Sequence, residues 1–139
     1  MLLDTAVLSL LFRRRAGAVR EADEPIAGEA RRLMTAGSGV LCGSVRQELL
    51  SGIANRRQFD LLRDRLRGWE QPVLSAADFE RAAECHNRCR AAGVAGSVVD
   101  FLLCGLSLER GWPIFTVDRD FERYAAVLGL RLWRGPRPN

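Results

Sequence analysis

The sequence contains no lysine, because all 21 of its basic residues are arginine. A P-loop nucleotide-binding site needs a lysine to reach the phosphates, and no GxGxxG motif follows a predicted strand. A receiver domain needs a lysine near its last strand. A phosphatase of the haloacid-dehalogenase type needs a second aspartate two residues after Asp4, where Ala6 stands instead. These absences exclude several common classes of α/β protein.

Long apolar runs are also absent. No stretch approaches the roughly 18 uncharged apolar residues of a membrane span. The first apolar segment contains Asp4 and is followed, not preceded, by Arg13, Arg14 and Arg15, which is the wrong order for a secretion signal. The sequence therefore predicts a soluble, cytoplasmic protein that contacts no membrane.

Cysteine and histidine are scarce, with four cysteines and one histidine. Cys42, Cys85, Cys89 and Cys104 lie in apolar surroundings, which favours free thiols in the core and predicts no disulfide. Cys85, His86 and Cys89 together suggest zinc, but no second ligand cluster accompanies them. A spacing of four places both cysteines on one helix face, so we expect core packing there.

The length of 139 residues and the 47% hydrophobic content suit a single domain with its own core. We expect this domain to span residues 1–133. The remaining residues, 134–139, contain Gly135, Pro136 and Pro138, and we expect them to form a disordered tail.

Short apolar runs alternate with amphipathic segments along the chain. The predicted strands cover residues 1–3, 40–42, 72–74, 114–116 and 130–133. The predicted helices cover residues 5–12, 26–36, 56–67, 76–92, 97–109 and 121–127, and a further helix begins at Ser44. Such alternation implies a parallel sheet with helices on both faces. The expected fold class is an α/β, three-layer α/β/α sandwich with a central, mostly parallel sheet.

Four separated acids are the main candidates for a functional site. Asp4 and Asp118 each follow a predicted buried strand, and ligands of open α/β sheets bind at that edge. Asp100 is the one acid in the first turns of an apolar helix, where a buried charge needs a partner. Glu48 borders the apolar stripe of its helix, so we expect it to be half-buried.

Each acid also has a purely structural interpretation. Asp4 and Asp118 could cap the helices that follow them, and Asp100 could close a capping box with Ser97. Asp120 could orient a metal ligand or could be a solvated acid in the first turn of a helix. The sequence leaves these alternatives open.

Convergent carboxylates repel one another unless a cation neutralises them. An all-oxygen ligand set favours Mg²⁺ or Mn²⁺ over zinc, and such ions support phosphodiester hydrolysis. Apart from the four acids, 21 arginines face 13 acidic residues, which favours binding to phosphate. The arginines that we expect to contact the phosphates of a nucleic acid are Arg13, Arg14, Arg63 and Arg67.

Four motifs in order, LLDT, QELL, SVVDFLLCGLSLERG and IFTVDRDF, give the chain a clear resemblance. It resembles a PIN domain from Leu2 to about Trp133, and more narrowly the VapC-type toxin ribonucleases of toxin–antitoxin pairs. The resemblance implies that Asp4 and Asp100 are the central metal ligands and that Glu48 and Asp118 complete the set. Asp120 belongs to the same motif as Asp118, and we include it among the metal-site residues.

The resemblance implies further properties. It implies a sheet of about five strands, dependence on Mg²⁺ or Mn²⁺, and cleavage of structured RNA such as tRNA or rRNA. It also implies a homodimer and a small VapB-like antitoxin whose tail occupies the active-site groove. The alternatives are a PIN nuclease of RNA maturation or DNA processing outside toxin–antitoxin systems, and a non-catalytic PIN-fold module that binds RNA or protein. An antitoxin gene immediately upstream would distinguish the toxin, and four mutually repelling acids argue against a pure binder.

Overall fold

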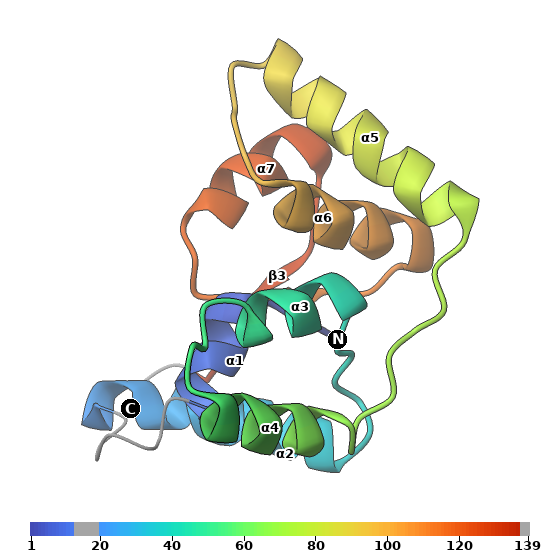
Figure 1. The fold of residues 1–139 in the computed structure, drawn as a ribbon. Helices are drawn as coiled ribbons and strands as arrows, with labels where there is room; N and C mark the ends of the chain where they lie inside the picture. The colour runs from blue at the N-terminus through green and yellow to red at the C-terminus, as the bar shows by residue number, and fades with distance from the viewer. Residues whose placement is uncertain (13–19, 137–139) are drawn as a thin grey trace.

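The computed structural model of the protein describes residues 1–12 and 20–136 (Figure 1). Its elements are, in chain order, β1 (Leu2–Leu3), α1 (Thr5–Phe12), the 3₁₀ helix η2 (Glu21–Asp23), α2 (Glu24–Thr35), α3 (Gly43–Leu50), α4 (Arg56–Leu66), α5 (Ala76–Ala91), α6 (Val98–Arg110), β2 (Ile114–Phe115), α7 (Asp120–Leu128) and β3 (Leu132–Trp133). None of the described helices has the length and apolar character needed to cross a membrane.

The strands form one parallel sheet in the order β1–β2–β3. Leu2 pairs with Ile114, and Ile114 pairs with Leu132. A parallel bridge between Leu2 and Val40 adds a further chain segment beside β1. The strands are short, yet their common direction brings the carboxyl ends of β1 and β2 to the same edge.

The strand count differs from the expectation of about five. The described residues hold three strands, and the predicted strand at residues 40–42 is reduced to the bridge at Val40. No strand forms at residues 72–74. Pro72 has no N–H to donate to a ladder, and the carbonyl oxygen of Val73 accepts a hydrogen bond from Arg110 at 2.8 Å. The Val73 side chain is 89% exposed, so this segment runs over the surface as a connection.

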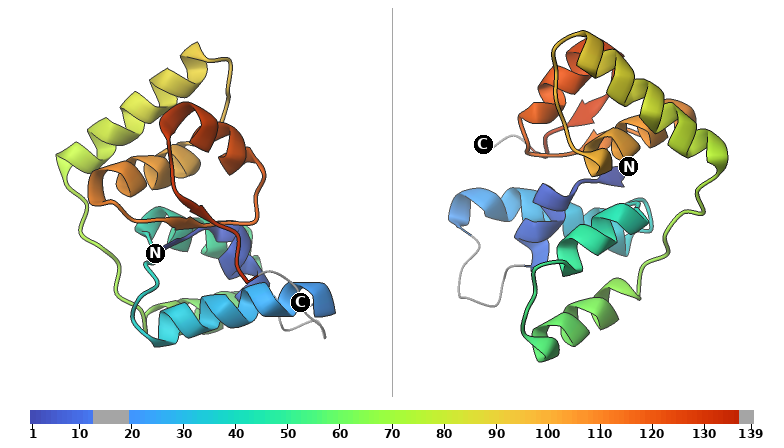
Figure 2. Two further views of the ribbon diagram at one scale, coloured as in Figure 1. Left: turned by 180° about the vertical axis from the view of Figure 1, so that it is seen from behind. Right: turned by 45° about the horizontal axis from the view of Figure 1, so that its top comes forward.

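The sheet lies between two groups of helices. Helices α5, α6 and α7 lie on one side of it, and α1 to α4 lie on the other (Figures 1 and 2). Within the first group α5 packs along α6, and within the second α1 packs against α2 and α3. The α/β fold class with a parallel sheet is therefore confirmed.

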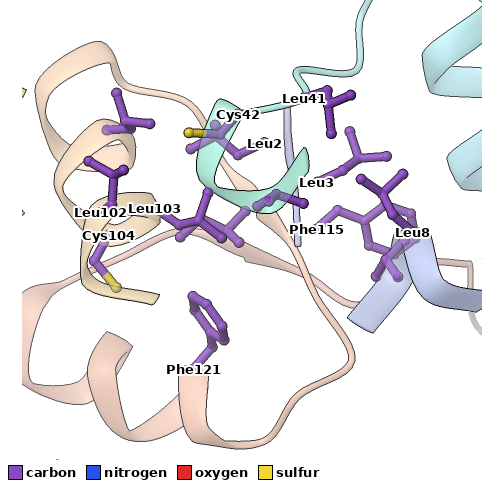
Figure 3. Packing of buried hydrophobic residues seen from close by; sticks show 14 of the residues in the cluster. Leu2, Leu3, Leu8, Leu41, Cys42, Leu102, Leu103, Cys104, Phe115 and Phe121 are labelled. Carbon is purple, nitrogen blue, oxygen red and sulfur yellow. The ribbon is translucent and has the colours of Figure 1, made fainter. Parts of the chain in front are cut away.

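The core is continuous across the sheet. Leu2, Leu3 and Phe115 are fully buried, and in Figure 3 they lie between α1 and α6. Phe121 of α7 closes the α6 side. This burial on both faces explains why β1 and β2 are uninterrupted apolar pairs.

The pair α5 and α6 approaches closely because α6 carries Gly105. A Cβ atom at this position would lie 2.7 Å from the backbone nitrogen of Ala82 on α5. Cys85 and Cys89 of α5 and Cys104 of α6 are buried as free thiols at this contact. Burial raises the pKa of all three thiols, which favours their neutral form. The predicted use of these cysteines as core residues is confirmed.

Candidate carboxylate site at the sheet edge

Asp4 follows β1 and Thr116 follows β2, and the side chains of these two residues are hydrogen-bonded to each other. The backbone N–H of Asp4 donates to the carbonyl oxygen of Phe115 at 3.0 Å, which extends the β1–β2 ladder by one residue. The hydroxyl of Thr116 then donates to Asp4 Oδ2 at 2.8 Å. The same hydroxyl oxygen accepts a hydrogen bond from the backbone N–H of Asp118 at 3.0 Å. Thr116 therefore connects Asp4 to the loop that carries Asp118.

Asp4 is buried, with 4% of its surface exposed. Burial raises the pKa of its carboxyl from 3.8 to about 6, and hydrogen bonds from Thr116 and Thr5 oppose this rise. The negative charges of Asp100 and Asp118 make smaller contributions to the same rise in pKa. Asp4 is thus a buried carboxylate with two other carboxylates close enough to repel it.

Asp100 reaches the site from the start of α6. Its backbone N–H donates to Ser97 Oγ at 3.0 Å, and its carboxylate accepts from the backbone N–H of Ser97 at 3.4 Å, which forms the predicted capping box. The Tyr124 hydroxyl of α7 also donates to Asp100 Oδ2 at 3.0 Å. Burial and the charge of Asp100 raise the pKa of Tyr124, so the phenol stays a donor. Asp100 is half-buried, and Val98 beside it is exposed, so only the later turns of α6 are buried as predicted.

Glu48 lies on α3 at the other side of Asp4. The hydroxyl of Thr5 donates to Glu48 Oε2 at 2.5 Å, while the backbone N–H of Thr5 donates to Asp4 Oδ1 at 2.7 Å. Thr5 therefore links the two carboxylates. The expectation that Glu48 is half-buried is wrong: its side chain is exposed, because it faces an open groove next to α3.

Asp118 and Asp120 are both exposed. Asp118 Oδ1 accepts a hydrogen bond from the backbone N–H of Asp120 at 2.9 Å, at the start of α7. Asp120 lies 3.7 Å from Arg123 in an exposed ion pair and stands in the first turn of α7. Asp118 thus contributes both to the acidic site and to the start of this helix, whereas the contacts of Asp120 are those of a solvated helix-start acid.

The donors of this site suit a hard divalent cation. They are carboxylate oxygens from Asp4, Glu48, Asp100 and Asp118. All of the ion pairs between described residues are formed by other acidic residues, so no described arginine is paired with these four. Within residues 1–12 and 20–136, no three or more His, Cys, Asp or Glu side chains are arranged so that they could hold a metal ion as they stand. The chemistry fits Mg²⁺ or Mn²⁺, and the carboxylates would have to close around the ion.

A cavity of about 570 Å³ opens beside Glu48, between α1, α3 and α4. Phe12, Leu61 and Leu62 are among its apolar lining residues, and Glu48 also lines it. The Arg65 guanidinium, which also lines the cavity, lies 5.1 Å from the centre of the Phe12 ring. The groove therefore has both apolar and polar lining residues, with one acid and one arginine as its charged groups.

Sequence reasoning missed three residues that orient the carboxylates: Thr5, Thr116 and Tyr124. Thr116 lies in the TxDxDF segment, so its place in that motif was a usable signal. Thr5 likewise belongs to the LLDT motif, but its hydroxyl binds Glu48, 43 residues away. Tyr124 binds Asp100, 24 residues away, and no local pattern marks it. Of the arginines expected to contact RNA, Arg13 and Arg14 lie outside the described residues.

We expect Thr116→Val to weaken Mn²⁺ binding by about tenfold or more, because outer groups that orient metal ligands commonly have effects of this size. Valine keeps the shape but removes the donor to Asp4 and the acceptor for the Asp118 N–H. Thr116→Ser is the matched control, since it keeps the hydroxyl. Isothermal titration with Mn²⁺ would measure both variants, and equal affinities would show that the hydroxyl does not orient the site.

Comparison with known proteins bears on both the family and the fold. The model of the PIN domain family matches residues 1–127. A search of curated proteins finds no match. The chain is similar in structure to FitAcB from Neisseria gonorrhoeae, with a TM-score of 0.71, 16% sequence identity, and 96% of each chain covered. At that identity the structural likeness bears on the fold alone, but the family model spans both strands that end at the carboxylates and the helices that bring Glu48 and Asp100, so this chain belongs to the PIN domain family.

Proposed function

We propose that this protein is a Mg²⁺- or Mn²⁺-dependent endoribonuclease of the VapC toxin type that hydrolyses structured RNA. The observation that carries the proposal is the state of Asp4. This carboxylate is buried, its pKa is raised to about 6, and the charges of Asp100 and Asp118 add to the rise without an ion pair from any described arginine. A divalent cation would remove this electrostatic cost.

Asp4 and Asp100 would be the central ligands, with Glu48 and Asp118 completing the set. When bound, the ion would polarise the scissile phosphate and lower the pKa of an attacking water. Thr116 and Thr5 hold Asp4 in a fixed direction, and Tyr124 does the same for Asp100. The chain's own contribution is thus to hold carboxylates in place before the substrate arrives.

The groove beside Glu48 supports a cognate antitoxin as the partner. Its apolar lining residues would contact the apolar face of a helical or extended segment, and Glu48 in the same lining would attract a basic side chain. A segment bound there would lie next to the carboxylates and would block the access of RNA. The proposal also includes a homodimer that acts in the cytoplasm, as the VapC resemblance implies.

Cleavage of total RNA by the purified protein tests this function. We expect discrete RNA fragments in reactions that contain Mg²⁺ or Mn²⁺. We expect no fragments in reactions that contain EDTA. Fragments that persist in EDTA would contradict the metal mechanism. No cleavage by folded protein in any metal would instead favour the non-catalytic binding module.

We expect Arg67→Ala to weaken RNA binding and to lessen its salt dependence by about one counterion. Arg67 is exposed and lies 3.8 Å from Asp64. Arg63→Ala should have a smaller effect, because Arg63 is already engaged by Asp60 and Asp64 at 2.8 and 2.9 Å. Fluorescence anisotropy with labelled RNA at several salt concentrations would measure both. Unchanged affinity and salt slope in Arg67→Ala would show that α4 does not face the RNA.

A further inference from the structure

Arg134, which directly follows β3, forms hydrogen bonds with the backbone of the loop that carries Asp118. Arg134 Nη1 donates to the carbonyl oxygen of Asp118 at 2.9 Å and to that of Thr116 at 3.4 Å. Its Nη2 donates to Glu122 Oε1 of α7 at 2.8 Å. The planar guanidinium presents its donors in a fixed fork, so these three acceptors are held in one arrangement. We expected residue 134 to begin a disordered tail, whereas here it makes three hydrogen bonds.

Gly135 fixes the path of the chain at this point. Its φ is +88°, a value that residues with a side chain rarely adopt. A Cβ atom would lie 3.3 Å from Phe115 of β2 and 3.4 Å from Ile26 of α2. Gly135 is itself buried, so the backbone packs against β2 directly. This packing places Arg134 next to the carboxyl end of β2, close to Thr116 and Asp118, which follow that strand.

We propose that Arg134 is a positioning residue that keeps the Asp118 loop in the geometry that binds the divalent ion. Arg134 contacts the backbone carbonyl of Asp118 and not its carboxylate, so the guanidinium does not neutralise the group that would bind the ion. The charge of Arg134 is matched by Glu122, so it does not compete with the ion. The role as a metal-site positioner rests on the proposed function, but the hold on the loop does not. Arg134 also lies beyond residues 1–127, the part matched by the family model.

Arg131 provides a matched control at the other end of the same strand. It precedes β3 as Arg134 follows it, and its guanidinium donates to the carbonyl oxygen of Gly111, before β2. Each arginine thus ties the ends of β2 and β3 together. Only Arg134 does so at the edge that carries the carboxylates.

The first test needs no metal. Amide hydrogen exchange measured by NMR in EDTA reports on the N–H groups of Asp118 and Asp120, which are bonded within the loop. Arg134→Ala should speed exchange at both amides by about tenfold or more, and Arg131→Ala should leave them unchanged. Equal exchange in the wild type and Arg134→Ala would overturn the proposal. So would equal acceleration by the two variants, because it would indicate general loosening of β3.

The second test measures Mn²⁺ affinity by electron paramagnetic resonance. We expect Arg134→Ala to weaken binding by about tenfold, and Arg131→Ala to leave it within about twofold. Arg134→Lys keeps the charge but cannot form the fork, so it should recover only a small part of the loss. Full recovery with lysine would overturn positioning by the fork. If the wild-type protein binds no Mn²⁺, the proposed function fails, and the exchange measurement still decides whether Arg134 holds the loop.

Discussion

Asp4→Asn and Asp100→Asn should each reduce RNA cleavage by about a thousandfold or more while the protein stays folded. Each substitution replaces one of the two proposed central carboxylate ligands with a neutral amide, which removes the negative charge and leaves one uncharged oxygen at that position. Metal-assisted stabilisation of the transition state contributes several kcal/mol, and each ~1.4 kcal/mol is a factor of ten in rate. Single-turnover cleavage in Mg²⁺ and in Mn²⁺ would measure the loss.

Glu109→Gln is a suitable control for these variants. Glu109 lies at the opposite end of α6 from Asp100 and pairs with Arg81 at 3.0 Å on the surface. Its removal should leave cleavage close to that of the wild type, because it lies far along the helix from the carboxylate site. Circular dichroism would check that all variants are folded. A folded Asp4→Asn, Asp100→Asn double mutant with undiminished cleavage would overturn the mechanism.

The positions of Asp4 and Asp118 were predictable because both follow apolar strand sequences, and parallel pairing fixes which edge they share. The capping box of Ser97 and Asp100 was predictable for a similar reason, since it is a local pattern. In both cases the signal and the structure involve neighbours in the sequence. The order of the four motifs then indicated the family that the family model confirms.

The remaining features depend on contacts that the sequence pattern does not encode. The exposure of Glu48 depends on how α3, α1 and α4 leave a groove open, which a helical wheel of α3 alone does not reveal. The strand predicted at residues 72–74 fails because Arg110, 37 residues away, takes the carbonyl oxygen of Val73. The contacts of Arg134 likewise follow from packing of Gly135 on Phe115. The predictions that were wrong therefore concern residues whose environment is set by partners far away in the sequence.

The second large effect concerns stability, and its sign is opposite to the effect on activity. In EDTA at pH 8, Asp4→Asn should raise the free energy of unfolding by about 3 kcal/mol. The pKa of Asp4 is about 6 in the folded protein, against 3.8 as its ordinary value. Ionised Asp4 therefore costs the folded state about 1.4 kcal/mol for each pH unit between these values. Asparagine removes the charge, and its amide can still accept from the backbone N–H of Thr5.

The pH dependence follows from the same linkage. Because the folded-state pKa is raised, the wild type keeps its full stability contribution from Asp4 below about pH 3.8 and loses it as the pH rises through about 6. The two proteins should thus have similar stability near pH 3, diverge between pH 4 and 6, and keep a constant difference above about pH 7. Urea unfolding at a series of pH values would measure this difference.

Two controls separate the charge of Asp4 from other effects. Glu80→Gln removes an exposed acid on α5, so its effect on stability should be small at every pH. Addition of Mn²⁺ should stabilise the wild type and leave Asp4→Asn almost unchanged, because only the wild type keeps this ligand. A difference between wild type and Asp4→Asn that does not depend on pH would show that packing, and not the buried charge, sets the stability. The other outcome is a pH-dependent difference that disappears when Mn²⁺ is added. It would show that the metal removes the energetic cost of burying the charged Asp4. The destabilising charge of Asp4 would then be the same charge that binds the ion.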